Sequence, residues 1–333
     1  MTSAPLVAVT GAEGFIGSHL TEALVASGCR VRAMAQYNSF SSYGWLETLS
    51  PEVLDHVEIV LGDVRDPGSV RGLVEDAECV YHLAALIAIP YSYRAPHSYV
   101  DTNVTGTLNV LEAVRALGTP RLVHTSTSET YGTAQTVPIT EDHPINTQSP
   151  YAASKAGGDR LADSYHASFG TPVVTLRPFN TFGPRQSMRA VIPSVIGQVA
   201  AGGTTITLGD LRPTRDFTYV KDTAQAFLAV GTAPAEDVVG RTFNAGTGGE
   251  ISVGDLVSLI GKVMDTALDV REDAERIRPA NSEVMRLVAD ATRLGAATGW
   301  SPGHTLEQGL AHTVEFFRNP ANLARYKTGI YNI

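Results

Sequence analysis

Short apolar runs alternate with amphipathic segments through the first half of this 333-residue chain, and this alternation constrains the fold more than any other feature. The runs are LVAVT (6–10), VRAMA (31–35), VEIVL, CVYHLA (79–84), RLVHTS (121–126) and PVVTL (172–176). Apolar runs of this length between helical segments are typical of buried parallel strands joined by crossover helices. The pattern therefore predicts an α/β fold, a doubly wound parallel sheet with helices on both faces.

The second half of the chain is less regular, with Gly and Pro in GPRQ, AGGTT and GDLRPTRD. Within it, FTYVKDTAQAFLAV (217–230) and RTFNAGT (241–247) predict a helix and a strand that return to the main sheet. We therefore expect two interleaved lobes rather than two consecutive domains. Residues 1–179 with 216–246 would form the sheet domain, and 180–215 with 247–333 a smaller lobe.

A glycine motif follows the first predicted strand. In VTGAEGFIGSHL, the residues Gly11, Gly14 and Gly17 are spaced G-x-x-G-x-x-G between a strand and an amphipathic helix. Such glycines let the backbone approach a pyrophosphate at the helix N-terminus, where amide hydrogens and the helix dipole favour an anion. The alternative is a tight strand-to-helix turn without a ligand.

The ends of the second and third strands bear on the choice of dinucleotide. Asp63, after the third strand, could accept a hydrogen bond from an adenine amino group or cap the next helix. The second strand ends at Ala35, where NAD-preferring sites usually carry an acid for the ribose hydroxyls. No Arg or Lys follows to meet a 2′-phosphate, so Gln36 or Asn38 could bind the ribose, and the sequence favours NAD over NADP.

Tyr151 and Lys155 lie four residues apart in SPYAASKAGGD and so share one face of a helix that begins after Pro150. An ammonium one turn from a phenol is expected to lower the phenol's pKa, which helps a tyrosine act as a base near neutrality. Taken alone, a Tyr and a Lys at this spacing are more often solvated surface residues.

Charge and composition exclude several classes of partner. The net charge is -9, without basic runs, which argues against nucleic acid or an anionic membrane. The longest apolar run, LAALIAIP (83–90), is too short to span a bilayer, and no signal peptide is evident, so we expect a cytoplasmic protein. The two cysteines, Cys29 and Cys79, lack metal-ligand spacing, so no metal is implied.

These motifs, in order, resemble those of the extended short-chain dehydrogenase/reductase family that acts on nucleotide sugars. The resemblance runs from about residue 5 to about residue 315. It rests on GAEGFIG, GDVRD, HLAA, NVTG, STSETYG, YAASK, RPFNTFGPR, RDFTYVKD and RPANSE. It implies a Rossmann-type sheet, a nucleotide-sugar-binding smaller lobe, NAD, and a homodimer formed by helices around 98–117 and 150–168.

The resemblance also implies a catalytic set. Thr127 would hydrogen-bond the 4-hydroxyl of the sugar, Tyr151 would remove its proton, and Lys155 would hold the nicotinamide ribose while tuning Tyr151. The implied cofactor-binding residues are Gly11, Gly14, Phe15, Ile16, Gly17, Gln36, Asp63, Val64, Leu83, Ala84, Ala85, Tyr151 and Lys155.

Glu129, two residues after Thr127, matches the Glu of the 4,6-dehydratases, which removes the C5 proton as water leaves from C6. Thymidine-linked glucose dehydratases carry an Asp before this Glu, whereas this chain has Ser128, so either Ser128 or Glu129 would protonate the leaving hydroxyl. The wider match, which includes YNSFSSYGWLE (37–47), resembles the dehydratases of nucleotide-linked N-acetylglucosamine in legionaminic acid pathways. UDP-glucuronate decarboxylases and 4-epimerases share much of this pattern, and a structural Glu129 that caps its turn is a further alternative.

The resemblance implies that a second diphosphate is bound by Arg185, Arg215 and Arg278, with Asn180 contacting the diphosphate or the sugar. Arginine suits phosphate because its planar fork donates two hydrogen bonds. Alternatively, Arg215 pairs with the adjacent acid, and Arg276 replaces Arg278. Tyr91 is a candidate wall residue for the hexose, although it could also be a packing residue.

Overall fold

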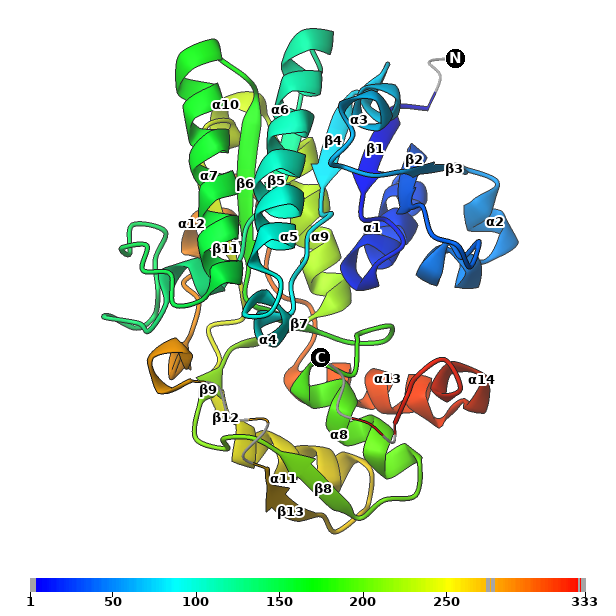
Figure 1. The fold of residues 1–333 in the computed structure, drawn as a ribbon, viewed down its shortest axis with the longest axis vertical. Helices are drawn as coiled ribbons and strands as arrows, with labels where there is room; N and C mark the ends of the chain where they lie inside the picture. Colours follow the sequence, from blue (N-terminus) through cyan, green and yellow to red (C-terminus); the bar gives the residue numbers. More distant parts are fainter. Residues whose placement is uncertain (1–3, 274–275, 277–278, 329, 331–333) are drawn as a thin grey trace.

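The structure, a computed structural model, describes residues 4–273, 276, 279–328 and 330. Within these residues, seven parallel strands form the main sheet in the order β11-β6-β5-β4-β1-β2-β3 (Figure 1). They are β1 (Leu6–Thr10), β2 (Arg30–Gln36), β3 (Val57–Gly62), β4 (Cys79–His82), β5 (Leu122–Thr125), β6 (Val173–Pro178) and β11 (Thr242–Ala245). The predicted α/β Rossmann-type doubly wound sheet is confirmed.

The order of the strands creates a crevice. The chain runs outward from β1 through β2 to β3 and then returns to β4 on the other side of β1. The connections leave β1 and β4 in opposite directions, and ligands of open α/β sheets bind at the carboxyl ends of the strands at such a point. Residues after β1 and β4 are thus placed to meet a ligand.

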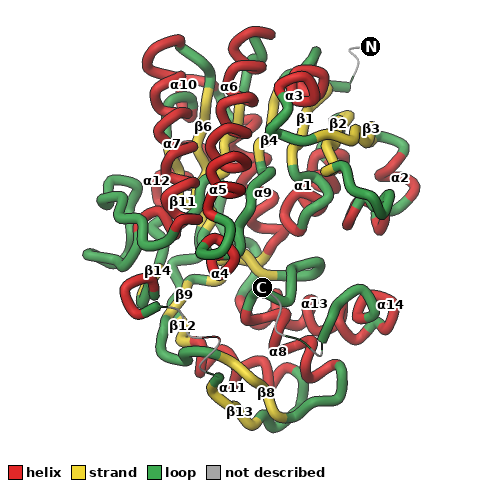
Figure 2. The backbone as a smooth tube through the Cα atoms, viewed as in Figure 1, coloured by secondary structure: helices red, strands yellow, loops and turns green. Residues whose placement is uncertain are grey.

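Helices cover both faces of the main sheet (Figures 1 and 2). One face packs against α3 (Pro67–Val74), α6 (Gly106–Leu117) and α7 (Pro150–Phe169), and the other against α1 (Phe15–Ala26), α9 (Val220–Thr232) and α12 (Thr292–Thr298). Each face buries its own apolar cluster, centred on Leu73, Val110 and Val114 on the first side and on Leu20, Leu24 and Phe227 on the second. Strands buried on both faces explain the continuous apolar runs in the sequence.

The smaller lobe contains short paired strands and several helices below the main sheet in Figure 1. Its strands are β7 (Asn180–Phe182) with β10 (Phe217–Tyr219), β8 (Thr205–Leu208) with β13 (Asp269–Glu272), and β9 (Thr214–Arg215) between β12 (Ile251–Ser252) and β14 (Arg286–Leu287). Its helices are α8 (Val191–Ala200), α11 (Val253–Val263), α13 (Leu306–Arg318) and α14 (Pro320–Leu323). These helices share a third apolar cluster, which includes Ile196, Leu256 and Leu310.

The remaining elements are short. They are η1 (Gly44–Thr48), α2 (Pro51–Leu54), α4 (Ile89–Ser92), α5 (Pro96–Val100), η2 (Asp101–Thr105), η3 (Ser128–Tyr131), α10 (Ala235–Val238) and η5 (Ala280–Ser282). Of these, η3 bears most directly on function, because it directly follows the end of β5 and carries Glu129.

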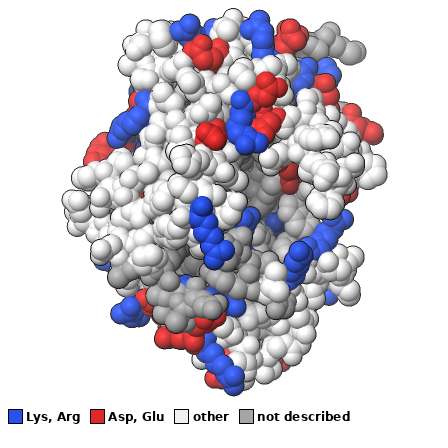
Figure 3. Space-filling model, in the orientation of Figure 1, with Lys and Arg blue, Asp and Glu red and all other residues white. Residues whose placement is uncertain are grey.

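The two lobes are interleaved along the chain. The segment that contains α9 and β11 belongs to the larger lobe, where α9 lies against α1 and β11 extends the sheet beside β6. On the face shown in Figure 3, the surface is hollowed between the upper and lower parts of the molecule, and basic side chains lie at the margin of the hollow. None of the helices in the described ranges has the length and apolar character needed to cross a membrane.

Candidate active site

The glycine-rich loop joins β1 to α1 at the crevice. Gly11 has a φ of +67°, and a Cβ on it would lie 2.8 Å from the backbone nitrogen of Ala84. A Cβ on Gly17 would lie 2.1 Å from the carbonyl oxygen of Gly11. Gly14 is the N-cap of α1 and has no side chain to bond the amides of the first turn. These amides are therefore available to an anion, so the loop fits the pyrophosphate of a dinucleotide.

Phe15 and Ile16 follow Gly14 in the first turn of α1. Both are half-buried and pack against the apolar cluster of the smaller lobe. The turn predicted to hold the cofactor is therefore in contact with both lobes.

The segment after β4 borders the glycine loop. The hydroxyl of Thr10 accepts hydrogen bonds from the amides of Leu83 (3.0 Å) and Ala84 (3.1 Å). Asn103 bonds both backbone groups of Leu86 and donates to the hydroxyl of Ser154 on α7, at 2.9 Å. Residues 83–85, including the predicted contact Ala85, are thus held between the glycine loop and α7.

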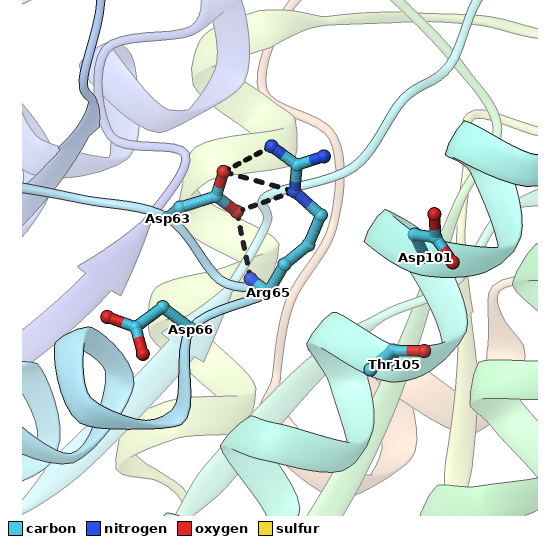
Figure 4. A pocket seen from close by; sticks show the side chains of 5 residues that line it. All are labelled: Asp63, Arg65, Asp66, Asp101 and Thr105. Atoms are coloured by element: carbon cyan, nitrogen blue, oxygen red, sulfur yellow. Dashed lines mark hydrogen bonds and ion pairs between the residues drawn. The ribbon is translucent and has the colours of Figure 1, made fainter.

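Asp63 lies just after β3, where it lines a surface cavity of about 410 Å³ together with Arg65, Asp66, Asp101 and Thr105 (Figure 4). Both oxygens of its carboxylate accept hydrogen bonds from the Arg65 guanidinium. These bonds lower the pKa of Asp63, so the group is a charged acceptor. The residue that caps α3 is Asp66 and not Asp63, which removes the capping alternative. The neighbouring Val64 is buried and packs where α6 begins, at Gly106.

The end of β2 has few groups to offer a ribose. Ala35 is fully buried, and the side chain of Gln36 is exposed. Asn38 is occupied by its own turn: its amide donates to the carbonyls of Gln36 and Ser42, and its oxygen accepts from the amides of Phe40 and Ser42. Since a carboxamide has two donor hydrogens and two acceptor sites, Asn38 has none left for a ligand.

Helix α7 carries the predicted catalytic pair. Ser149 caps the helix by accepting from the amide of Ala152 at 3.1 Å. Tyr151, Lys155 and Asp159 follow at intervals of four residues and are all buried, so they lie on the face of α7 turned toward the sheet. The Lys155 ammonium donates to the carbonyl of Thr125, the last residue of β5, at 2.6 Å.

Burial dominates the titration of this pair. It raises the pKa of the Tyr151 phenol well above its usual value, while a hydrogen bond with Thr127 lowers it and the charge of Glu129 raises it. Burial also lowers the pKa of Lys155 to about 8, against the opposing effect of Asp159. The expectation that Lys155 tunes the phenol stays a prediction, since the ammonium lies one turn from Tyr151 and donates to the carbonyl of Thr125.

Thr127 and Glu129 lie on the turn that follows β5. The Thr127 hydroxyl, rather than Glu129, caps the turn, because it accepts from the Glu129 amide at 3.3 Å. The Glu129 side chain is half-buried, and in the described part of the chain no hydrogen bond or ion pair involves its carboxylate. Ser128, by contrast, is buried within the turn. A partly accessible carboxylate, without a partner among the described residues, therefore lies within electrostatic range of the Tyr151 phenol, and the capping alternative for Glu129 fails.

A buried charged network lies beneath this turn, and the sequence reading missed it. Asp159 accepts from Ser126 (2.6 Å), from Arg177 (2.8 Å) and from His124 (3.0 Å). Arg177 also donates to Ser126 and to the Tyr131 hydroxyl. Arg177 is therefore hydrogen-bonded to both ends of the segment that carries Thr127 and Glu129. Through Asp159 it also connects this segment to α7. The signal was available, because Asp159 follows Lys155 at the same four-residue spacing as Lys155 follows Tyr151.

The predicted substrate residues are placed unequally. Asn180 begins β7, and its side-chain nitrogen is buried without a partner among the described residues. Arg215 is buried on β9 and pairs with Glu283 at 3.2 Å, whereas the adjacent Asp216 bonds Thr247 and other backbone amides, so Arg215 does not pair with its neighbour. Arg278 lies outside the described residues.

Both terminal nitrogens of the Arg185 guanidinium donate to Glu22 of α1, at 2.9 and 3.0 Å, so a phosphate bound by Arg185 would have to share it with this acid. The predicted role of Arg185 stays a prediction. Although burial opposes it, hydrogen bonds from His19 and Arg185 lower the pKa of Glu22 to about 2. Tyr91 is 42% exposed, and its ring is the first of a row that continues through Tyr99 to Tyr151. The alternative residue Arg276 donates to Thr207 and Asp273.

A glycine loop at the sheet crevice, next to a Thr, a Tyr and a Lys at the end of β5 and on α7, defines a dinucleotide-dependent enzyme of the short-chain dehydrogenase/reductase type. The sequence model of the GDP-mannose 4,6 dehydratase family matches residues 8–313. The chain therefore belongs to this family of nucleotide-sugar dehydratases and epimerases.

Relatives of known activity include both reactions. The chain is 36% identical over 318 residues to a UDP-glucose 4-epimerase of Mycolicibacterium smegmatis, covering 93% of this chain and 98% of that protein. It is 34% identical over 331 residues to a dTDP-glucose 4,6-dehydratase of Xanthomonas campestris pv. campestris, covering 93% and 92%.

Solved structures give the same picture. The dTDP-glucose 4,6-dehydratase of Streptomyces venezuelae, solved with NAD bound, matches with a TM-score of 0.86 and 28% identity over 97% of this chain and 99% of that one. The UDP-N-acetylglucosamine 4-epimerase of Methanobrevibacter ruminantium, in complex with UDP-N-acetylmuramic acid, matches with a TM-score of 0.84 and 30% identity over 95% and 99%. The protein is thus an enzyme of the dehydratase/epimerase family.

Proposed function

We propose that the protein is an NAD-dependent nucleotide-sugar 4,6-dehydratase, acting on a nucleoside-diphosphate N-acetylglucosamine or a related hexose. The observation that carries this proposal is the position of Glu129. Its carboxylate is half-buried, close enough to Tyr151 to raise the pKa of the phenol, and without a partner in the described chain. A 4-epimerase needs no base at C5, whereas a dehydratase does.

The first chemical task falls to Thr127 and Tyr151. Thr127 orients the 4-hydroxyl of the sugar, and Tyr151 takes its proton, with Lys155 one turn away to stabilise the phenolate. Bound NAD supplies the hydride acceptor for C4 and the hydride donor for C6, so it is regenerated in each turnover. Because Tyr151 is buried, its phenolate needs a nearby positive charge, which the protonated Lys155 provides.

The second task falls to Glu129. A ketone at C4 acidifies the hydrogen on C5, and the Glu129 carboxylate removes that proton as the C6–OH bond breaks. The departing hydroxide needs a proton to leave as water. The burial of Ser128 within the turn supports Glu129 as the donor of this proton, so one carboxylate would serve first as base and then as acid. A proton from solvent would then add to C5 as the hydride reaches C6, which is why deuterated water labels C5.

The smaller lobe would bind the nucleotide sugar. Asn180 supports this role because a buried amide without a partner is costly, and a diphosphate or sugar oxygen would relieve that cost. Arg215 would bind the diphosphate while Glu283 keeps its fork in place. Tyr91 would wall the hexose, and the exposed surfaces of α6 and α7 would form the homodimer implied by the family.

The experiment is incubation in deuterated water with GDP- and UDP-linked N-acetylglucosamine, UDP-glucuronate and thymidine-linked glucose, followed by mass spectrometry and NMR of the products. A dehydratase yields a product that has lost one water and carries deuterium at C5. Loss of carbon dioxide would identify a decarboxylase, and inversion at C4 at constant mass a 4-epimerase; either would refute the proposal.

The variant Glu129→Gln tests whether Glu129 is the base that removes the C5 proton. We expect NAD binding to persist and dehydration to fall by about 10²–10⁴-fold, the usual contribution of a general base. Glu236→Gln, on the exposed part of helix α10, removes the same charge and should leave the rate unchanged. Dehydration at the wild-type rate in Glu129→Gln would show that another group is the base.

A further inference from the structure

The cofactor site described above lacks the acid that usually meets the adenosine ribose. Of the residues at the end of β2, Ala35 is buried and Asn38 uses all its hydrogen bonds within its own turn, whereas the exposed Gln36 can offer only an uncharged amide. A ribose diol presents two hydroxyl donors that need acceptors. A charged acceptor must therefore come from another segment.

Glu13 reaches this position from the glycine loop. One oxygen of its carboxylate, Oε1, accepts from the backbone amide of Gln36 at 3.1 Å, which places the carboxylate at the carboxyl end of β2. The other oxygen, Oε2, is sealed from solvent and has no hydrogen-bond partner in the described chain. Burial raises the pKa of this carboxyl above its usual value, while the Gln36 amide acts in the opposite direction. Glu13 thus places a carboxylate near the end of β2, where the usual ribose-binding acid is absent, and one of its oxygens has no partner in the described chain.

Backbone contacts with η1 hold Glu13 on one side, whereas the turn before Gly44 carries exposed side chains. The Glu13 carbonyl accepts from the amide of Trp45 at 2.9 Å, and a Cβ on Gly44 would lie 2.7 Å from the same carbonyl oxygen. The turn before Gly44, by contrast, carries Tyr37 and Phe40 with 73% and 89% of their surfaces exposed. The hydrogen bonds of Asn38 hold the backbone of this turn, whereas its two exposed rings can change rotamer when a ligand binds.

We propose that Glu13 accepts a hydrogen bond from the adenosine ribose 2′-hydroxyl of the dinucleotide and is the residue that excludes a 2′-phosphate. The inference rests on the NAD site of the proposed function. The hydroxyl can bond the second lone pair of Oε1, or Oε2 after a change of the Glu13 rotamer. A phosphate in the same place would bring two negative charges against a carboxylate.

Among the described residues that line the cavity at the end of β3, the one cation, Arg65, is already paired. Arg65, at the end of the next strand, already donates to both oxygens of Asp63 and faces Asp101 across the cavity in Figure 4. The local charge at this edge is therefore set by acids, which opposes a 2′-phosphate and tolerates a 2′-hydroxyl.

The test is a binding experiment that requires no turnover. Dissociation constants for NAD, NADP, ADP-ribose and nicotinamide mononucleotide are measured calorimetrically on protein freed of copurifying dinucleotide. The proteins are the wild type, Glu13→Gln, Glu13→Ala and, as a control of equal charge change, Glu52→Gln on the exposed helix α2. Circular dichroism and thermal unfolding show which variants are folded, and the near-isosteric Glu13→Gln serves if Glu13→Ala is not.

We expect the preference for NAD over NADP to fall about tenfold or more in Glu13→Gln, as befits a hydrogen bond to a charged group. Affinity for ADP-ribose should weaken in Glu13→Ala, affinity for nicotinamide mononucleotide should not, and Glu52→Gln should match the wild type. An unchanged preference in a folded Glu13→Gln would overturn the inference alone. A wild type that binds neither dinucleotide would overturn the proposed cofactor site as well.

Discussion

The two sides of the crevice are built in different ways. On the cofactor side, the binding groups are backbone amides and small residues at the ends of parallel strands, and beneath them Asp159 accepts from three neighbours. On the substrate side, the arginines proposed to meet a diphosphate lie on a loop or a two-residue strand, and each has an acid among its partners, Glu22 for Arg185 and Glu283 for Arg215.

The difference shows which part of the site is set before a ligand arrives. A buried carboxylate with three donors holds its neighbours in one arrangement, because breaking any of these bonds leaves an unsatisfied buried charge. The acids that pair with the substrate-side arginines are partly exposed, so solvent weakens these ion pairs. The catalytic side is thus the more firmly preorganised, and a diphosphate bound as proposed would share each arginine with an acid.

The strongest test of this comparison is Arg177→Met. It leaves Asp159 buried without its guanidinium, so we expect the free energy of unfolding to fall by about 3–5 kcal/mol in urea titrations. Arg212 also pairs with an aspartate, Asp210, but its side chain is 80% exposed, so Arg212→Ala should unfold at the same urea concentration as the wild type. Equal losses in the two variants would contradict a preorganised catalytic side.

Gly17→Ala tests the backbone part of the cofactor side. The added Cβ would meet the Gly11 carbonyl oxygen at 2.1 Å, so the loop must shift. We expect this shift to cost about 1–3 kcal/mol of binding free energy, which weakens NAD binding roughly 10–100-fold in calorimetry. Gly72→Ala provides the matched control, because Gly72 lies inside helix α3 with open space around it. That variant should bind NAD normally and gain about 0.5–1 kcal/mol in stability. Normal NAD binding by Gly17→Ala would remove the pyrophosphate role of the loop.

The smallest effect concerns pH. Burial lowers the pKa of Lys155 to about 8, so the ammonium that supports Tyr151 is lost as the pH rises through that value. We expect kcat to fall by up to tenfold per unit above about pH 8, and Lys155→Arg, which stays charged, to move this limb to higher pH. An alkaline limb unchanged by Lys155→Arg would assign it to another group.

Lys155 also makes the free energy of unfolding depend on pH. The pKa of Lys155 is lower in the folded than in the unfolded chain, so between pH 8 and its unfolded value the unfolded state binds more protons. The contribution of Lys155 to the free energy of unfolding therefore rises with pH in this window. Urea titrations of the wild type and Lys155→Met across it would show a slope difference of this sign.

Local patterns in the sequence predicted the features that depend on neighbours in the chain. The strand-helix alternation gave the parallel sheet, and the spacing of Tyr151 and Lys155 placed both on one buried face of α7. The glycine spacing indicated a loop whose close approaches leave no room for side chains at Gly11 and Gly17.

Partners of charged residues were not predictable in this way. Arg185 and Glu22 are 163 positions apart, and Asp159 joins side chains from β5, β6 and α7, so no spacing in the sequence indicates these pairs. The same is true of Glu13. The sequence places it between the glycines of the loop, but it does not indicate that the carboxylate accepts from Gln36 at the end of β2.

The sequence by itself determined the parallel sheet, the glycine loop and the family, because these follow from periodicity and from motifs a few residues long. Only the tertiary structure decided which carboxylates are paired and which are left available, since an ion pair depends on where distant segments meet. That distinction separates Glu129 and Glu13, with their incompletely satisfied carboxylates, from Glu22 and Glu283, which are bound to arginines.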